Sequence, residues 1–272
     1  MKEQLTEIAR TAGGRGEPII LYDRHDVMVI QVGGVVAKSH GPRTTDLAVR
    51  LRVARALPDI LLAPFGPPQA LGTEQASLWP AGEPVDPGDP DAAPWEEGAR
   101  LLAALHAAPL AAHGPLPRQG APARVCEVMT RLPADHPASP VVRRAFAALP
   151  DPLETVGVPR LVHGDFHLGQ LVRHEDAWRL IDVDELGWGD PTWDLARPAG
   201  LFAAGVISAG VFSRFVAAYR EAGGPAIPAE GDLWEALDIP AKALAIQTAA
   251  RCVSHAVEEN RPLDELETAL ID

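Results

Sequence analysis

Short apolar runs alternate with turn residues along the first third of the chain. Runs rich in valine and isoleucine occupy residues 18–22, 27–31 and 35–39, with charged residues after the first run and a glycine pair after the second. This spacing is typical of antiparallel strands. The polar, amphipathic residues 1–14 predict a short helix before the strands.

A second helix is predicted after these strands. Thr44 or Thr45 can cap it, apolar residues recur three or four positions apart over 47–57, and Pro58 stops it. Residues 76–79 form one more short apolar run. The first part of the chain is therefore rich in strands.

The pattern changes over residues 80–94, which carry five of the chain's 27 prolines. This composition is typical of a linker with an attached loop, so we place the main boundary here. The expected division is a lobe over 1–80, a hinge near 78–82 and a second lobe over 81–272.

Helical patterns dominate the second lobe. Helices are predicted over 94–107, 122–132 and 139–149, and the chain is almost wholly helical from residue 191 onward. Two short strands are predicted near 160–162 and 178–181. A small β-rich lobe followed by a larger helical lobe makes the fold class α+β.

Composition narrows the function classes. The 272 residues are 47% hydrophobic and 22% charged, which excludes a disordered chain. Cys126 and Cys252 are too few for a disulfide framework and favour a reducing, cytoplasmic compartment. No apolar run approaches the ~20 residues of a membrane span, and the N-terminus lacks the apolar core of a signal peptide. The net charge of −13 argues against nucleic acid as a partner.

The densest cluster of ionisable residues lies within 161–196. His163 and Asp165 follow an apolar strand, Gln170 comes five positions after Asp165, and Asp182 ends the next predicted strand. A carboxylate that leaves a strand can hold Mg²⁺, and a second one can orient or deprotonate a hydroxyl. Their order along the chain reproduces the catalytic loop and metal-binding aspartate of a kinase, which points to phosphoryl transfer.

This segment resembles the motifs HGDxHxGN and IDxDxxGxGDPxxDLA of the aminoglycoside phosphotransferase family, whose members are small-molecule kinases with a protein-kinase-like, two-lobed fold. The resemblance implies that Asp165 is the catalytic aspartate and that Asp182 is a Mg²⁺ ligand. Gln170 stands where the family usually has a metal-binding Asn, and it offers the same carbonyl oxygen. The variant HGDxHLGQ is similar to the loop of maltokinases, although this chain is much shorter than a maltokinase.

The other polar residues of the segment receive supporting roles. His163 and His167 are expected to brace the catalytic loop, and Asp194 resembles the family aspartate that supports this loop. Asp184 is either a partner at the metal site or a solvated acid. Asp190, followed by a proline, is expected to cap the next helix.

Lys38 ends the third predicted strand, in the place of the kinase lysine that binds the α- and β-phosphates. Asp46 is the only acid of the following helix and is either the partner of Lys38 or an i,i+4 partner of Arg50. The resemblance places Leu78 and Trp79 in the hinge, where backbone groups would meet the adenine ring. The glycines over 13–16 do not form GxGxxG and can simply end the first helix.

Three functions compete at this point. The favoured one is a kinase that uses ATP or GTP and Mg²⁺ to phosphorylate a hydroxyl of an aminoglycoside-, amine- or sugar-like small molecule. The second is a nucleotide-binding pseudokinase, suggested by Gln170 and by the weak candidate partner of Lys38. The third is a metal-dependent hydrolase, because His163, Asp165 and His167 form HxDxH and alternation on an extended segment would aim all three at one metal.

The net charge and the acidic C-terminal helices favour a cationic acceptor, although a solvated acidic surface explains the same acids. Neither a membrane nor nucleic acid is expected as a partner, and the chain is expected to be a monomer or a homodimer. The acids in question are Glu230, Asp232, Glu235, Asp238, Glu258 and Glu259.

Overall fold

The computed structural model describes residues 1–271 except 25–26, 42–45, 87, 90 and 151–156. These residues form two compact units. Unit 1 comprises Met1–Val85, Ala111–Pro117 and Gly169–Leu186, and unit 2 comprises Asp86–Leu110, Arg118–Leu168 and Gly187–Asp272. The sequence suggested one cut near residue 80, whereas both units here are built from separate stretches of chain.

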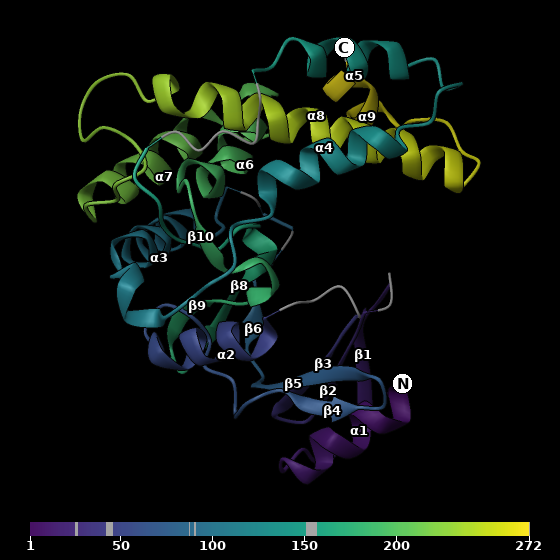
Figure 1. Cartoon of the computed structure of the whole chain (residues 1–272), viewed down its shortest axis with the longest axis vertical. Helices are drawn as coiled ribbons and strands as arrows, with labels where there is room; N and C mark the ends of the chain where they lie inside the picture. The colour runs from purple at the N-terminus through teal and green to yellow at the C-terminus, as the bar shows by residue number, and fades with distance from the viewer. Residues whose placement is uncertain (25–26, 42–45, 87, 90, 151–156, 272) are drawn as a thin grey trace. The chain divides into compact units, whose positions relative to one another are not determined.

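An antiparallel five-stranded sheet with the order β1-β2-β3-β5-β4 forms the main part of unit 1 (Figure 1). The three strands expected at the start of the chain are confirmed, and the apolar run at 76–79 lies within a fourth. The short strand β4 was not predicted. The strands are β1 (Pro18–Arg24), β2 (Val27–Val32), β3 (Val35–His40), β4 (Gln69–Leu71) and β5 (Glu74–Pro80).

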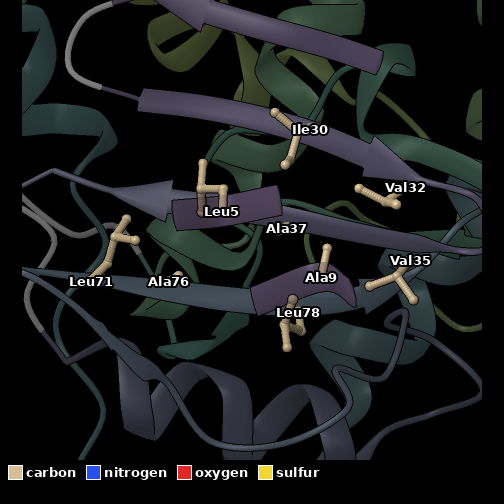
Figure 2. Packing of buried hydrophobic residues seen from close by; sticks show 9 residues of the cluster. All are labelled: Leu5, Ala9, Ile30, Val32, Val35, Ala37, Leu71, Ala76 and Leu78. Carbon is tan, nitrogen blue, oxygen red and sulfur yellow. The ribbon is translucent and has the colours of Figure 1, made fainter. Parts of the chain in front are cut away.

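Helix α1 (Lys2–Thr11) covers one face of this sheet. Leu5 and Ala9 pack on alternate strand residues, in a core completed by Ile30, Val32, Val35, Ala37, Leu71, Ala76 and Leu78 (Figure 2). Side chains alternate across a strand, so the buried Ala37 places Lys38 on the opposite face. Packing against α1 therefore fixes which face of the sheet carries Lys38.

The glycines after α1 end the helix and let the chain run close to the sheet. Gly13 has a φ of 100°, and its N–H donates to the carbonyl of Arg10. A Cβ at Gly14 would lie 2.7 Å from the carbonyl oxygen of Val32, so only glycine fits there.

The rest of unit 1 comprises α2 (Leu47–Ala56) and a three-stranded sheet of β6 (Glu83–Pro84), β8 (Leu171–His174) and β9 (Ala177–Leu180). The predicted helix over 47–57 is confirmed. Its proposed caps, Thr44 and Thr45, lie outside the described residues. Strand β9 corresponds to the strand predicted near 178–181, whereas β8 was not predicted.

Unit 2 is mainly helical, and α6 and α4 both pack against α8 while α3 packs against α7. Its one sheet pairs β7 (Arg160–Val162) with β10 (Gly187–Gly189). Within the described residues, none of the helices combines the length and the apolar character needed to cross a bilayer. The helices are α3 (Trp95–Ala107), α4 (Ala121–Arg131), α5 (Ser139–Ala147), α6 (Thr192–Ala203), α7 (Ala209–Glu221), α8 (Trp234–Glu258) and α9 (Glu265–Ile271).

Candidate active site

In unit 1 one ammonium group bridges two carboxylates. Lys38 Nζ lies 2.6 Å from Asp182 Oδ1 and 2.9 Å from Asp184 Oδ2. Lys38 is on β3, Asp182 follows β9, and Asp184 lies in the 3₁₀ turn Val183–Glu185. Asp182 has a φ of 60°, a left-handed conformation that non-glycine residues rarely adopt and that is often found at functional sites.

Electrostatic attraction keeps Lys38 and Asp184 charged. Burial alone would lower the pKa of Lys38, but the charges of Asp182 and Asp184 outweigh burial and raise it. Burial would raise the pKa of Asp184, but His40 and Lys38 together hold it well below its ordinary value. Gln170 Nε2 lies 3.3 Å from Asp182 Oδ2, so the amide expected at the metal site is beside this carboxylate.

A chain of polar contacts that the sequence analysis missed leads to Asp184: two hydrogen bonds reach His40, which lies within ion-pair distance of the carboxylate. Trp79 Nε1 donates to Ser77 Oγ at 2.7 Å, and Ser77 Oγ lies 2.7 Å from His40 Nε2. His40 Nδ1 lies 3.1 Å from Asp184 Oδ1. Because the hydroxyl accepts from Trp79, its single proton is available for His40 Nε2, and the ring proton on Nδ1 then faces the carboxylate. The signal was present in the sequence, since His40 lies two positions after Lys38 on the same strand face.

Asp46 is not brought to Lys38. It is exposed and lies directly before α2, whereas the described carboxylates that pair with Lys38 are those of Asp182 and Asp184. Arg50, the other candidate partner of Asp46, donates from its Nε to the carbonyl of Leu186 at 3.0 Å.

The two hinge residues differ in their surroundings. The Leu78 side chain is part of the core beneath α1, and its carbonyl accepts a hydrogen bond from Phe65 N at 2.9 Å. Trp79 is buried and is held by Ser77. The carbonyl of Leu78 is therefore already engaged within unit 1.

In unit 2, Asp165 lies among arginines. Its Oδ1 is 2.8 Å from Arg197 Nη2 and 3.8 Å from Arg124 Nη2, and Arg124 also donates to the carbonyl of Gly164 at 2.6 Å. Burial alone would raise the pKa of Asp165, but the positive charges of Arg197 and Arg124 lower it. The sequence analysis did not single out either arginine, although Arg197 lies one turn after Asp194 in α6.

The carboxylate of Asp194 holds the backbone that carries Asp165. It accepts hydrogen bonds from His163 N and Gly164 N, both at 2.7 Å, and His106 Nε2 lies 3.0 Å from it. Burial raises the pKa of Asp194, but the contact with His106 outweighs burial and lowers it.

The other polar residues of the 161–196 segment lie in the Asp165 loop or at the start of α6. His163 is buried and His167 is half-buried in the same loop. Asp190 lies one residue before the helix cap and accepts hydrogen bonds from the backbone and hydroxyl of Thr192, at 3.0 and 2.7 Å.

The donors in unit 1 suit a magnesium ion better than a transition metal. Two carboxylates and an amide offer oxygen ligands, and Mg²⁺ takes its remaining ligands from water and phosphate. In the part of the chain that the structure describes, no three His, Cys, Asp or Glu side chains gather as a metal cage. Asp165 faces guanidinium groups, so the arrangement does not favour the HxDxH hydrolase.

Comparison with solved structures shows the fold. A choline/ethanolamine kinase family protein from Mesorhizobium loti matches with a TM-score of 0.66 and 17% identity, over 99% of this chain and 89% of that one. The macrolide 2'-phosphotransferase MphH from Brachybacterium faecium matches with a TM-score of 0.57 and 19% identity, over 98% of both chains. The amicoumacin kinase hAmiN, in complex with AMP-PNP, Ca²⁺ and Ami, matches with a TM-score of 0.64 and 14% identity, over 98% and 90%.

Comparison with family models gives the assignment. No curated protein matches the chain. The model described as "Phosphotransferase enzyme family" matches residues 39–238, which include the whole 161–196 segment. The expected α+β, protein-kinase-like fold is confirmed by the structural neighbours. The chain belongs to the phosphotransferase enzyme family and is a small-molecule phosphotransferase.

Proposed function

We propose that the protein transfers the γ-phosphoryl group of ATP to a hydroxyl of a small molecule and that it uses Mg²⁺. The observation that carries this proposal is the ion-pair bridge from Lys38 to Asp182 and Asp184. In the sequence, Lys38 precedes the loop that holds Asp165, and the two aspartates follow it. One cation and two carboxylates are the groups that phosphate and Mg²⁺ require.

Unit 1 supplies the nucleotide and metal ligands in this proposal. The Lys38 ammonium pairs with the α- and β-phosphates when ATP binds, while Asp182, Asp184 and Gln170 hold Mg²⁺. When bound, the ion neutralises charge that develops on the phosphate oxygens. AMP-PNP and Ca²⁺ in the structure of the amicoumacin kinase support a nucleotide and a divalent cation.

Asp165 acts on the acceptor. Its carboxylate is held charged by Arg197, so it accepts a hydrogen bond from the acceptor hydroxyl and takes its proton. The hydroxyl oxygen forms the new bond to the γ-phosphorus, the bond from that phosphorus to the bridging oxygen breaks, and ADP leaves with the electron pair. The low pKa makes Asp165 a weak base, so its main contribution is to orient the hydroxyl.

Local charge is a better guide to the acceptor than net charge. The expectation of a cation rested on the charge of −13 and on the C-terminal acids. Several of these acids have partners nearby in the chain: Asp238 pairs with Lys242 at 2.7 Å, and Glu259 with Arg261 at 2.7 Å. The charged groups beside Asp165 are arginines.

The test is a nucleotide-consumption screen with ATP or GTP and Mg²⁺ over amines, sugars, antibiotics and hydroxy acids, followed by two variants. Asp165→Asn should lower kcat by ~10²–10⁴ and leave the affinity for ATP unchanged, because it removes the carboxylate that orients the hydroxyl and takes its proton but does not touch the nucleotide. Asp182→Asn should remove the part of ATP binding that depends on Mg²⁺. Asp176→Asn is the matched control, because it also removes one negative charge but at an exposed side chain.

Two outcomes would contradict the proposal. If ATP raises the Tm of the wild-type protein equally with and without Mg²⁺, Asp182 is not a metal ligand. If ATP and Mg²⁺ bind but no acceptor is phosphorylated, the protein is a nucleotide-binding pseudokinase.

A further inference from the structure

Two arginines pair with Asp165, and a third lies on the helix against which their two helices pack. Arg124 is on α4, Arg197 is on α6, and Arg251 is on α8. Arg197 and Arg124 lie within ion-pair distance of Asp165, at 2.8 and 3.8 Å. Helices α4 and α6 both pack against α8, and α4 and α8 lie side by side in Figure 1. The packing of unit 2 therefore brings these positive charges to the candidate catalytic carboxylate.

The described acidic side chains near these three arginines do not neutralise their positive charge. Burial lowers the pKa of Arg251, and the charges of Arg124 and Arg197 lower it further, against the opposing effects of Asp165 and Glu127. Glu127 is itself paired with Arg131. Like charges held together in a partly desolvated place are costly unless a counter-charge joins them.

Two of the guanidinium groups retain hydrogen-bonding capacity. Arg251 forms no hydrogen bond or ion pair with any residue that the structure describes, and its side chain is exposed. Arg197 uses Nη2 for Asp165, and its side chain remains 25% exposed. Guanidinium groups bind carboxylate and phosphate through two parallel hydrogen bonds. These two groups can therefore receive an anion beside Asp165.

We propose that the acceptor is an anion, a hydroxyl-bearing small molecule whose carboxylate or phosphate group binds Arg197 and Arg251. The inference rests on the proposed kinase function and names the substrate class for the same site. Binding the acidic group there places a hydroxyl of the same molecule near Asp165. The transfer itself is unchanged, since the hydroxyl proton still goes to Asp165 and ADP is still the leaving group.

The γ-phosphate of the nucleotide is the other anion that these arginines could bind, and the experiment separates the two sources. Four compounds on one three-carbon scaffold serve as probes: glycerol 3-phosphate, glycerate, glycerol and 3-amino-1,2-propanediol. Calorimetry on the full chain at constant ionic strength gives a Kd for each probe and, separately, for ATP with Mg²⁺. The two anions should bind at least ~10-fold more tightly than the neutral and cationic probes.

Variants assign the binding to the arginines. Arg251→Gln should weaken both anions by ~10-fold or more and change the Kd of ATP with Mg²⁺ by less than about twofold. Arg197→Lys keeps the charge but loses the planar fork, and should weaken the anions as well. Lys242→Gln removes one positive charge from the same helix, α8, and should change neither affinity. The Tm of each variant shows that it is folded.

Each other outcome overturns the inference. It fails if neither anion binds, if glycerol or the amine binds as tightly, or if Arg251→Gln leaves the anions unaffected. It also fails if Arg251→Gln raises the Kd of ATP with Mg²⁺ and leaves the Kd of the two anions unchanged, because the arginines then bind the nucleotide. Failure of ATP and Mg²⁺ to bind the wild-type protein counts against the proposed function and is read from its own titration.

Discussion

Two chains of polar contacts in the molecule have the same order of groups, and each ends on an aspartate of the 161–196 segment. In unit 1, an N–H of Trp79 donates to the Ser77 hydroxyl, which contacts one ring nitrogen of His40 at 2.7 Å. The other ring nitrogen lies 3.1 Å from Asp184. The histidine thus connects a hydroxyl to a carboxylate.

The chain in unit 2 repeats this order with different residues. The backbone N–H of Ala226 donates to the Tyr219 hydroxyl at 3.0 Å, which lies 2.7 Å from His106 Nδ1. His106 Nε2 lies 3.0 Å from Asp194. In both chains the hydroxyl that accepts one hydrogen bond has a proton for the ring, so the other ring nitrogen presents its proton to the carboxylate.

The difference lies in what else each carboxylate contacts. The Asp194 side chain is 0% exposed, and its remaining capacity goes to the backbone N–H groups of His163 and Gly164. The Asp184 side chain is 22% exposed and contacts the Lys38 ammonium. The same design therefore fixes a backbone segment in unit 2 and orients a charged group in unit 1. Burial of the final carboxylate is therefore the main difference between the two chains.

Substitution of Asp194 should mainly lower stability, whereas substitution of Asp184 should mainly lower activity. Asp194→Asn places an amide against backbone donors in a fully buried site, so unfolding free energy should fall by about 3 kcal/mol. Asp184→Asn should cost much less stability but lower kcat or the Mg²⁺-dependent affinity for ATP by ~10²-fold. Thermal unfolding and ATP titration of both variants measure this. Equal losses of stability would mean that both chains are structural.

Two variants of His40 test whether the chain in unit 1 orients Asp184. The amide of His40→Asn can replace the Nδ1 donor, whereas that of His40→Gln replaces Nε2 and its contact with Ser77. At similar Tm, His40→Gln should lose about 10-fold in Mg²⁺-dependent ATP affinity, and His40→Asn should retain most of it. The opposite ranking, or equal losses, would show that His40 only packs.

Acid should weaken the chain in unit 2 in a defined range of pH. The pKa of Asp194 is lower in the folded protein than its ordinary value of 3.8. A carboxyl with a depressed pKa stabilises the fold above its unfolded value, and this contribution is lost as the pH falls toward the folded value. The stability difference between the wild type and Asp194→Asn should stay constant from about pH 7 to about pH 5 and shrink below 3.8, by at most ~1.4 kcal/mol per pH unit. A difference that shrinks already near neutral pH would assign the effect to another group.

Periodicity predicted the larger elements of the fold. The apolar runs that form β1, β2 and β3 and the helical patterns of unit 2 were long enough to carry a signal. The strands β4, β8 and β10 have only three or four residues, too few for a period to show, and only their apolar runs indicated the presence of the equally short strands β7 and β9. Nothing local indicates that Gly169–Leu186 folds with the start of the chain, because that grouping depends on contacts distant in sequence.

Some residues of the candidate site were predicted and others were not, again because local sequence does not report contacts between distant parts of the chain. Asp165, Gln170 and Asp182 lie in one short segment, so their spacing could be recognised. The arginines around Asp165 come from separate helices, and only the packing of those helices brings them together. Asp46 was considered as one of two possible partners because it is close to Lys38 in sequence, whereas the structure gives Lys38 two carboxylates from about 144 positions away.

The discontinuous construction of unit 1 sets an order of events during synthesis. A ribosome releases Lys38 and the whole five-stranded sheet long before it makes Gly169–Leu186, the stretch that carries Asp182 and Asp184. Until then the ammonium lacks the two carboxylates with which it pairs in the folded protein, and β6 lacks its neighbour β8. The nascent N-terminal part must therefore wait, partly formed, while the first two stretches of unit 2, Asp86–Leu110 and Arg118–Leu168, are translated, and this is the interval in which a chaperone has most to protect.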